Sequence, residues 1–235
     1  MKKVVIFDLY STVLKDGFFS FQHAMEELYH AYFEEKCTLE EFTEYERSFF
    51  PAFLERREQN IETHLMEDEI IYIFEHFGVQ PLKSWDEVEY EIMNWMQKGG
   101  LLDSVQEALE ELQKKDIDMY ILSNTVFTGK VTERLLEEFG ILHYFKKVYA
   151  SADYRVRKPG REFFDIAIAE ILEDRKELCK EDIIFVGNDY EMDAKGAIGA
   201  ELDAVWYNVE HAENVDSLEI YEIDDMRKLI AIVEN

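Results

Sequence analysis

The second half of the chain alternates short apolar strands with helical segments, and this alternation limits the possible folds more than any other feature. After a first strand predicted at 3–7, further strands are predicted near 118–122, 146–150, 183–186 and 203–207. Helices are predicted over 103–114, 126–139, 161–173, 190–200 and 223–233. Helices that connect parallel strands cover both faces of the sheet, so the pattern predicts an α/β fold with a doubly wound, Rossmann-like parallel sheet.

The region 18–98 interrupts this alternation, because it has almost no strand signal and its apolar residues recur at helical spacing. Four or five helices are expected there, separated at Pro51, at Gly78 and Pro81, and at Gly99 and Gly100. We therefore predict a discontinuous core domain of 1–13 and 100–235 with an inserted, all-helical cap domain of 14–99. Gly17, Gly99 and Gly100 lie where hinges are expected, near 14–17 and 98–100.

The charge of the chain restricts its partners. It has 52 acidic and 25 basic residues and a formal net charge of −27. A field of this sign repels nucleic acid and anionic membrane surfaces, so neither is expected as a partner. A small anionic substrate remains possible only if its site supplies local positive charge.

Cysteine use and the N-terminal sequence predict a cytoplasmic location. Cys37 and Cys179 are the only cysteines, too far apart in sequence to suggest a disulfide framework or a zinc site, and they fit a reducing compartment. The apolar run Val4 to Phe7 ends at Asp8, which is too short for the core of a signal peptide. No segment of the sequence approaches the length of a membrane span.

Four polar clusters follow predicted strands. They are Asp8 to Thr12, Ser123 with Asn124, Arg157 with Lys158 and Pro159, and Gly187 with Asn188 and Asp189. Each alone could be a helix cap or a surface turn. In open α/β sheets, however, ligands bind beyond the carboxyl ends of the strands, so the four clusters are expected to converge on one site.

In this order, the clusters resemble the four motifs of the haloacid dehalogenase superfamily, and the resemblance covers essentially the whole chain. The matching segments are Phe7 to Thr12, Leu122 to Asn124, Lys158 with Pro159, and Phe185 to Asp193. The inserted helical region is similar to the cap of subfamily I. The resemblance implies a hydrolase that forms a covalent intermediate on an aspartate.

Several catalytic roles are implied by this resemblance. Asp8 is the nucleophile, Ser123 donates a hydrogen bond to the transferred group, and Lys158 neutralises the nucleophile and the substrate anion. Tyr10 belongs to the same catalytic group, and Asn124 and Thr12 are expected to contact the substrate.

The resemblance also implies a magnesium ion, which prefers hard oxygen ligands. Its expected ligands are Asp8, the backbone carbonyl of Tyr10 and Asp189, with Asn188 as the alternative to Asp189. Asp193 is expected next to these ligands, without binding the metal ion itself.

Two departures from the superfamily pattern leave the reaction open. Phosphate-hydrolysing members carry a second aspartate, which acts as general acid and base, where this chain has Tyr10. Tyrosine at this position resembles the L-2-haloacid dehalogenase branch. That branch, however, works without metal and lacks the acidic fourth motif, whereas this chain keeps Asp189 and Asp193. Three carboxylates facing Lys158 alone would favour a divalent cation.

We therefore weigh three hypotheses. The leading one is magnesium-dependent hydrolysis of a small phosphorylated metabolite. The second is a metal-independent 2-haloacid dehalogenase. The third is a binding or regulatory module that keeps the fold but has lost its acid–base residue.

Overall fold

The computed structural model describes residues 1–60 and 65–235, so the part of the predicted cap at 61–64 lies outside it. Six strands of the described residues form one sheet in the order β5-β4-β1-β6-β7-β8, and all neighbouring strands are parallel. They are β1 (Val4–Phe7), β4 (Asp118–Ser123), β5 (Phe145–Ala150), β6 (Ile183–Gly187), β7 (Asp203–Tyr207) and β8 (Tyr221–Ile223). The predicted doubly wound α/β class is confirmed.

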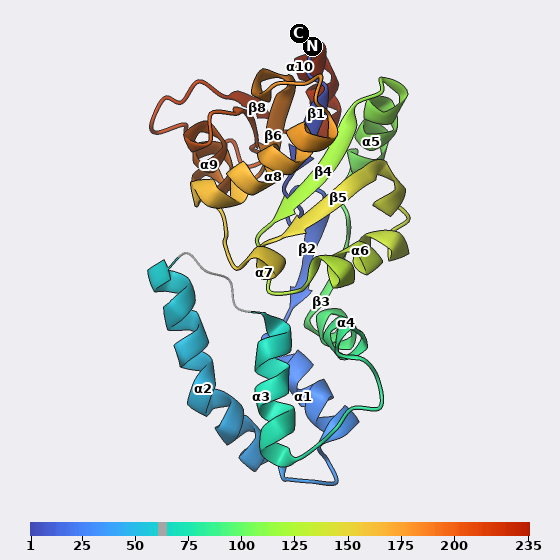
Figure 1. Cartoon of the computed structure of the whole chain (residues 1–235), viewed down its shortest axis with the longest axis vertical. Coiled ribbons are helices and arrows are strands. Elements are labelled where there is room, and N and C mark those ends of the chain that lie inside the picture. The colour runs from blue at the N-terminus through green and yellow to red at the C-terminus, as the bar shows by residue number, and fades with distance from the viewer. Residues whose placement is uncertain (61–64) are drawn as a thin grey trace.

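The central strands are buried on both faces, because helices cover both sides of the sheet (Figure 1). In β1, Ile6 belongs to a hydrophobic cluster with Phe163, whereas the next residue, Phe7, belongs to a second cluster with Leu109. The core helices are α5 (Val105–Lys114), α6 (Gly129–Glu138), α7 (Ser151–Tyr154), α8 (Arg161–Asp174), α9 (Lys195–Gly199) and α10 (Leu229–Glu234). None of the helices in the described residues is long and apolar enough to cross a membrane.

Two segments near the C-terminus differ from the prediction. The helix expected over 190–200 is a π-helical turn, Tyr190–Ala194, followed by the short α9. The final helix, expected from 223, begins only at Leu229, because Tyr221–Ile223 pairs with β7 as an edge strand. So short a strand forms through its pairing partner, which a local pattern does not contain.

The cap consists of four helices within the described residues, at the lower end of Figure 1. They are α1 (Phe21–Tyr32), α2 (Leu39–Asn60), α3 (Met66–Phe77) and α4 (Trp85–Met96). Aromatic rings fill the space between them, since the ring centroid of Phe33 lies 5.2 Å from that of Phe42 and 4.8 Å from that of Phe74. Gly78 ends α3 with a left-handed φ of 62°. The break expected at Pro51 is absent, because α2 continues through it, which a proline allows at the loss of one main-chain hydrogen bond.

The two connections between cap and core form an antiparallel ribbon, which the sequence did not predict. It consists of β2 (Leu14–Phe19) and β3 (Gln97–Leu101), which are far apart in the sequence, so their pairing leaves no local signal. A Cβ atom at Gly99 would lie 2.6 Å from the backbone oxygen of Lys15. Gly99 therefore allows the two strands to approach closely, a different role from the hinge flexibility expected of it.

The cap also contacts the core directly. Glu89 on α4 accepts hydrogen bonds from the backbone N–H of Thr128 at 2.8 Å and from its hydroxyl group at 2.9 Å. Arg155, just after α7, forms an ion pair with Asp68 on α3, with 2.6 Å between Arg155 Nη1 and Asp68 Oδ2. The cap is thus held against the core next to the carboxyl ends of the strands.

Candidate functional site

The carboxyl ends of β1, β4 and β6 are neighbours at the centre of the sheet, because β1 pairs with β4 on one side and with β6 on the other. From β1 the chain builds outward first through β4 and β5, then in the opposite direction through β6, β7 and β8. Such a reversal leaves a crevice at the strand ends, the usual ligand site of an open α/β sheet. The predicted polar clusters follow these strands and β5.

Lys158 lies at the centre of a buried charged cluster. Its ammonium group donates to Asp8 Oδ1 at 2.7 Å and to Asp193 Oδ1 at 2.6 Å, and the residue is only 1% exposed. Burial alone would lower the pKa of Lys158, but the two carboxylates outweigh it and raise this pKa above its ordinary value. Lys158 therefore stays charged and neutralises one of the two carboxylates.

Asp193 lies closely against the end of β6. Burial raises the pKa of its carboxyl group to about 7, although the Lys158 ammonium opposes this shift. Its Oδ2 accepts a hydrogen bond from the backbone N–H of Asp189 at 2.9 Å. A Cβ atom at Gly187 would lie 2.3 Å from the Asp193 carboxyl group, so only glycine fits there. This role of Gly187 was not predicted, although a glycine directly before a polar loop was a visible signal.

Asn124 holds the backbone of Lys158. Its Oδ1 accepts from the Lys158 N–H at 2.8 Å, and its Nδ2 donates to the Lys158 carbonyl at 3.0 Å. The amide side chain therefore positions the lysine, which sequence reasoning had not suggested. Its expected contact with substrate stays a prediction.

Ser123 has a buried hydroxyl group without a hydrogen-bond partner among the described residues. It ends β4, and the whole residue is inaccessible to solvent. A buried hydroxyl that lacks a partner costs roughly 1–3 kcal/mol, so its presence at a strand end needs an explanation. A ligand oxygen in the crevice would supply the missing partner, as the sequence prediction for Ser123 requires.

Thr12 links the first and fourth polar clusters. Its hydroxyl group donates to Asp8 Oδ2 at 2.9 Å and lies 3.2 Å from Asn188 Oδ1. Asp189, in contrast, is exposed and accepts from the backbone N–H of Met192 at 2.8 Å, capping the π-helical turn. Of the two alternatives for the fourth-motif ligand, the Asn188 amide therefore shares the Thr12 hydroxyl group with Asp8, whereas the Asp189 carboxylate caps the turn.

This placement changes the expected charge of the site. Two carboxylates, those of Asp8 and Asp193, contact Lys158, and the third expected one, Asp189, is drawn away to the helix N-terminus. When both carboxylates are ionised, Lys158 leaves one negative charge of the cluster uncompensated. Among the described residues, no group of three His, Cys, Asp or Glu side chains could hold a metal ion. Any cation would need amide and backbone oxygens as well.

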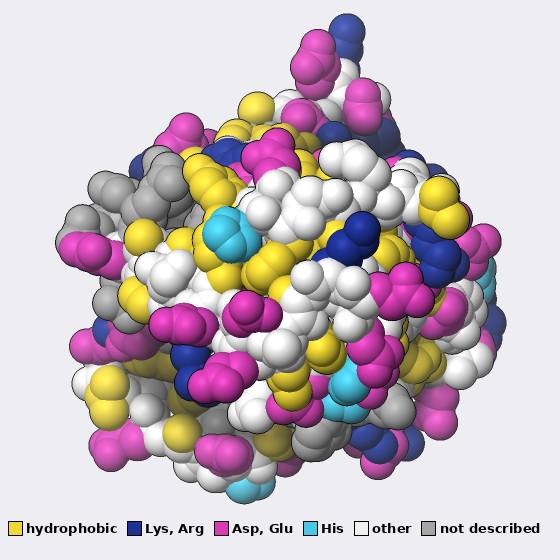
Figure 2. Space-filling view, turned by 90° about the horizontal axis from the view of Figure 1, so that it is seen from below, with side chains coloured by type: hydrophobic (Ala, Val, Ile, Leu, Met, Phe, Trp, Pro, Cys, Tyr) yellow, Lys and Arg dark blue, Asp and Glu magenta, His cyan; other side chains and the backbone are white. Residues whose placement is uncertain are grey.

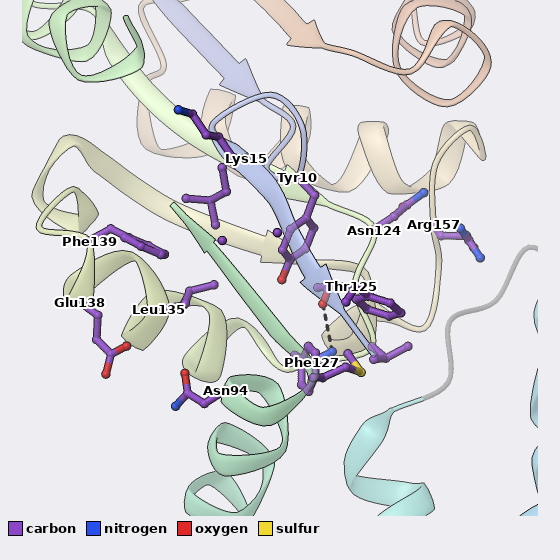
Figure 3. A pocket seen from close by; sticks show the side chains of 16 residues that line it. Tyr10, Lys15, Asn94, Asn124, Thr125, Phe127, Leu135, Glu138, Phe139 and Arg157 are labelled. Carbon is purple, nitrogen blue, oxygen red and sulfur yellow. Dashed lines mark hydrogen bonds between the residues drawn. The ribbon is translucent and has the colours of Figure 1, made fainter. Parts of the chain in front are cut away.

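Tyr10 extends from the loop after β1 into a cavity beside this cluster. Its ring lines the cavity together with Asn124 (Figure 3). The position expected to carry the acid–base group therefore presents a half-buried phenol to this space.

The chain matches a family model described as a hydrolase, haloacid dehalogenase-like hydrolase, over residues 2–201. The chain belongs to this family. It is similar to the pyrimidine 5'-nucleotidase PynA of Streptococcus pneumoniae, with 28% identity over 158 residues. That match covers 66% of this hydrolase and 64% of PynA, which is less than two thirds of the relative.

Solved structures share the fold along the whole chain. The magnesium-bound crystal structure of the HAD-hydrolase YfnB from Bacillus subtilis has a TM-score of 0.60 at 20% identity, covering 100% of this hydrolase and 99% of that chain. A 2-haloacid dehalogenase from Pseudomonas syringae has a TM-score of 0.65, also at 20% identity and with the same coverage. At this identity the two structures support the fold alone, and a fold does not by itself determine the reaction.

Proposed function

We propose that this hydrolase cleaves phosphate esters of small metabolites through a covalent intermediate on Asp8. The observation that carries the proposal is the buried contact of Asp8 with Lys158, at the strand ends where the Ser123 hydroxyl group has no hydrogen-bond partner within 1–60 and 65–235. A carboxylate can act as the nucleophile, while a fixed ammonium group and a hydroxyl donor can bind the oxygens of a tetrahedral anion. The similarity to a 5'-nucleotidase supports a phosphate ester as the substrate.

The reaction takes place in two displacements. A carboxylate oxygen of Asp8 attacks phosphorus, the bond from phosphorus to the alcohol oxygen breaks, and the alcohol leaves with a proton taken from solvent. Water then attacks the aspartyl phosphate, which releases inorganic phosphate and restores the carboxylate. Ser123 donates to a phosphoryl oxygen, and Lys158 neutralises charge on the nucleophile and the phosphoryl group.

Tyr10 restricts which esters react well. A phenol has an unperturbed pKa of about 10, so it is a poor substitute for a carboxyl group as a general acid near neutral pH. General acid–base catalysis is worth about 10²–10⁴-fold. Substrates whose alcohol leaves without protonation should therefore be preferred.

The residues present also fit a magnesium ion. Because the Asn188 amide is neutral, this set of ligands carries one negative charge fewer than a set with two carboxylates. Asp8, the Asn188 amide oxygen and the Tyr10 carbonyl are all hard oxygen donors, and the Asp8 and Asn188 oxygens flank the same Thr12 hydroxyl group. The negative charge that Lys158 leaves uncompensated favours a cation there. When bound, Mg²⁺ would offset the charge of the phosphoryl group.

A second candidate is the metal-independent 2-haloacid dehalogenase. It is favoured by Tyr10 and by the placement of an amide, Asn188, beside the nucleophile in place of a carboxylate. In that reaction Asp8 would displace halide from carbon, and halide needs no proton from a general acid.

The experiment that separates the two candidates measures both products. The purified protein is incubated with a panel of phosphate esters and with 2-chloropropionate, each with Mg²⁺ or with a chelator. Phosphate release that needs Mg²⁺ and is lost in Asp8→Asn supports the proposal. Chloride release that continues with chelator shows the dehalogenase, and turnover of neither substrate class favours a binding or regulatory module.

A further inference from the structure

A cavity of about 620 Å³ lies beside the buried charged cluster. Its walls come from the ribbon β2–β3, the end of α4, the loop after β4, and α6. Binding sites for small molecules usually have volumes of about 300–1,000 Å³, so the cavity could enclose a ligand much larger than a phosphate group.

The cavity is lined by residues that are close in sequence to the reacting groups. Tyr10, two residues after the nucleophile, and Asn124, directly after Ser123, both line it. In Figure 3 the ring of Tyr10 lies between Asn124 and Arg157 on one side and Leu135, Glu138 and Phe139 on the opposite side. A phosphate ester bound at the strand ends would therefore direct its alcohol portion into this cavity.

Much of the cavity lining is apolar. Phe127 is 1% exposed and Leu135 is 7% exposed, and the half-buried rings of Tyr10 and Phe139 also line the cavity. Aromatic walls favour a flat ring, which can stack or meet them edge to face.

We propose, on the basis of the proposed function, that this cavity is the leaving-group site for aromatic phosphate esters, whose alcohol is a phenol. Two observations lead to the same class. The aromatic wall fits a planar ring, and Tyr10 occupies the position where a general acid would protonate an alkoxide. A phenol loses its proton near pH ~10 and so leaves as phenolate without help, whereas an aliphatic alcohol does not. The phosphorus–oxygen bond breaks towards the phenolate oxygen, which then takes a proton from water.

The test compares three esters: 2-naphthyl phosphate, phenyl phosphate and glycerol 3-phosphate. The two aromatic esters have phenol-type leaving groups, so the ratio of their kcat/KM values reports the cavity rather than the leaving-group chemistry. The additional ring should raise kcat/KM by about fivefold or more through burial of apolar surface. Glycerol 3-phosphate should be the poorest substrate by at least about tenfold.

Variants that narrow the cavity test whether the cavity causes the preference for 2-naphthyl phosphate. In Leu135→Trp the ratio of naphthyl to phenyl kcat/KM should fall to about one or below, because the indole occupies the space for the second ring. Val126→Trp, at a half-buried position in the lining of the same cavity, makes the same test if Leu135→Trp does not fold. Leu82→Trp is the matched control, since Leu82 is fully exposed on the cap and the ratio should be unchanged.

The outcomes separate the substrate class from the reaction. Phosphate release without a preference for naphthyl phosphate, or a preference that both cavity variants retain, overturns the aromatic class and leaves the phosphatase proposal standing. No phosphate release from any of the three esters overturns the phosphatase proposal and the substrate class together.

Discussion

The ammonium group of Lys158 lies 2.6 Å from the carboxylate of Asp193, and both residues are at least 98% buried, with exposures of 1% and 2%. Neither charge has water to stabilise it, so each depends on its neighbours. Because Asp8 is the second partner of Lys158, the same contact that stabilises the buried cluster also sets the charge around the nucleophile.

Removing the ammonium should destabilise the fold. In Lys158→Met, Asp8 and Asp193 face each other without a counter-charge, and breaking a buried pair from one side typically costs about 3–5 kcal/mol. Urea unfolding of the variant measures this loss. The double variant Lys158→Met with Asp193→Asn should recover a large part of it. If the single variant is as stable as the wild type, the cluster contributes little to folding.

Replacing the nucleophile should abolish turnover without loss of the fold. An amide cannot form the acyl intermediate, so Asp8→Asn should lower kcat by more than about 10³-fold on any true substrate. Lys158 keeps Asp193 as its partner in this variant. Asp189→Asn is the matched control, because that carboxylate is exposed and asparagine caps helices equally well. Substantial activity in Asp8→Asn would rule out covalent catalysis through this residue.

Restoring a carboxyl group at position 10 should change leaving-group dependence. Tyr10→Asp should speed hydrolysis of alkyl phosphates by about 10²-fold or more and that of aromatic phosphates much less, because only the alkoxide needs a proton. Steady-state kinetics on glycerol 3-phosphate and phenyl phosphate measure the difference. An equal effect on both esters would show that Tyr10 does not occupy the general-acid position.

The affinity for Mg²⁺ should depend on Asn188 rather than on Asp189. Asn188→Asp adds a charged ligand beside Asp8 and should lower the Kd for Mg²⁺ by about tenfold or more. Isothermal titration calorimetry measures this Kd directly, without an activity assay. Asp189→Ala should leave the Kd unchanged and cost about 1 kcal/mol of stability through the lost helix cap. The opposite result would place Asp189 at the metal.

Glu89 should make stability depend on pH. Burial raises the pKa of this carboxyl group to about 7, and its bonds from Thr128 only partly offset the shift. Between about pH 4.5 and 7 the folded state keeps the proton that the unfolded chain has lost, so the free energy of unfolding falls as pH rises. The contribution is on the order of 2 kcal/mol. Urea unfolding at pH 5 and pH 7.5 should show a smaller decrease in Glu89→Gln than in the wild type.

Much of the fold was readable from local pattern, because buried parallel strands are continuous apolar runs. The segments Ile183–Gly187 and Asp203–Tyr207 are strands within one residue of their predicted ends. The ribbon β2–β3 and the edge strand β8 were not readable, since each forms by pairing with a distant segment. Pro51 was read as a break because local propensity cannot show that a helix will continue past a proline.

The residues of the site also divide into those that the sequence predicted and those that only the structure could place. The sequence alone determined that Asp8, Ser123 and Lys158 would end or follow strands, because chain order and apolar runs decide which residues reach that edge of a parallel sheet. Only the tertiary structure shows that the adjacent Asn188 and Asp189 side chains have different partners. Spacing allowed either, but the helix N-terminus attracts the Asp189 carboxylate and leaves the Asn188 amide beside Thr12. A choice between neighbouring residues depends on side-chain direction, which is set by three-dimensional contacts and not by the order of the chain.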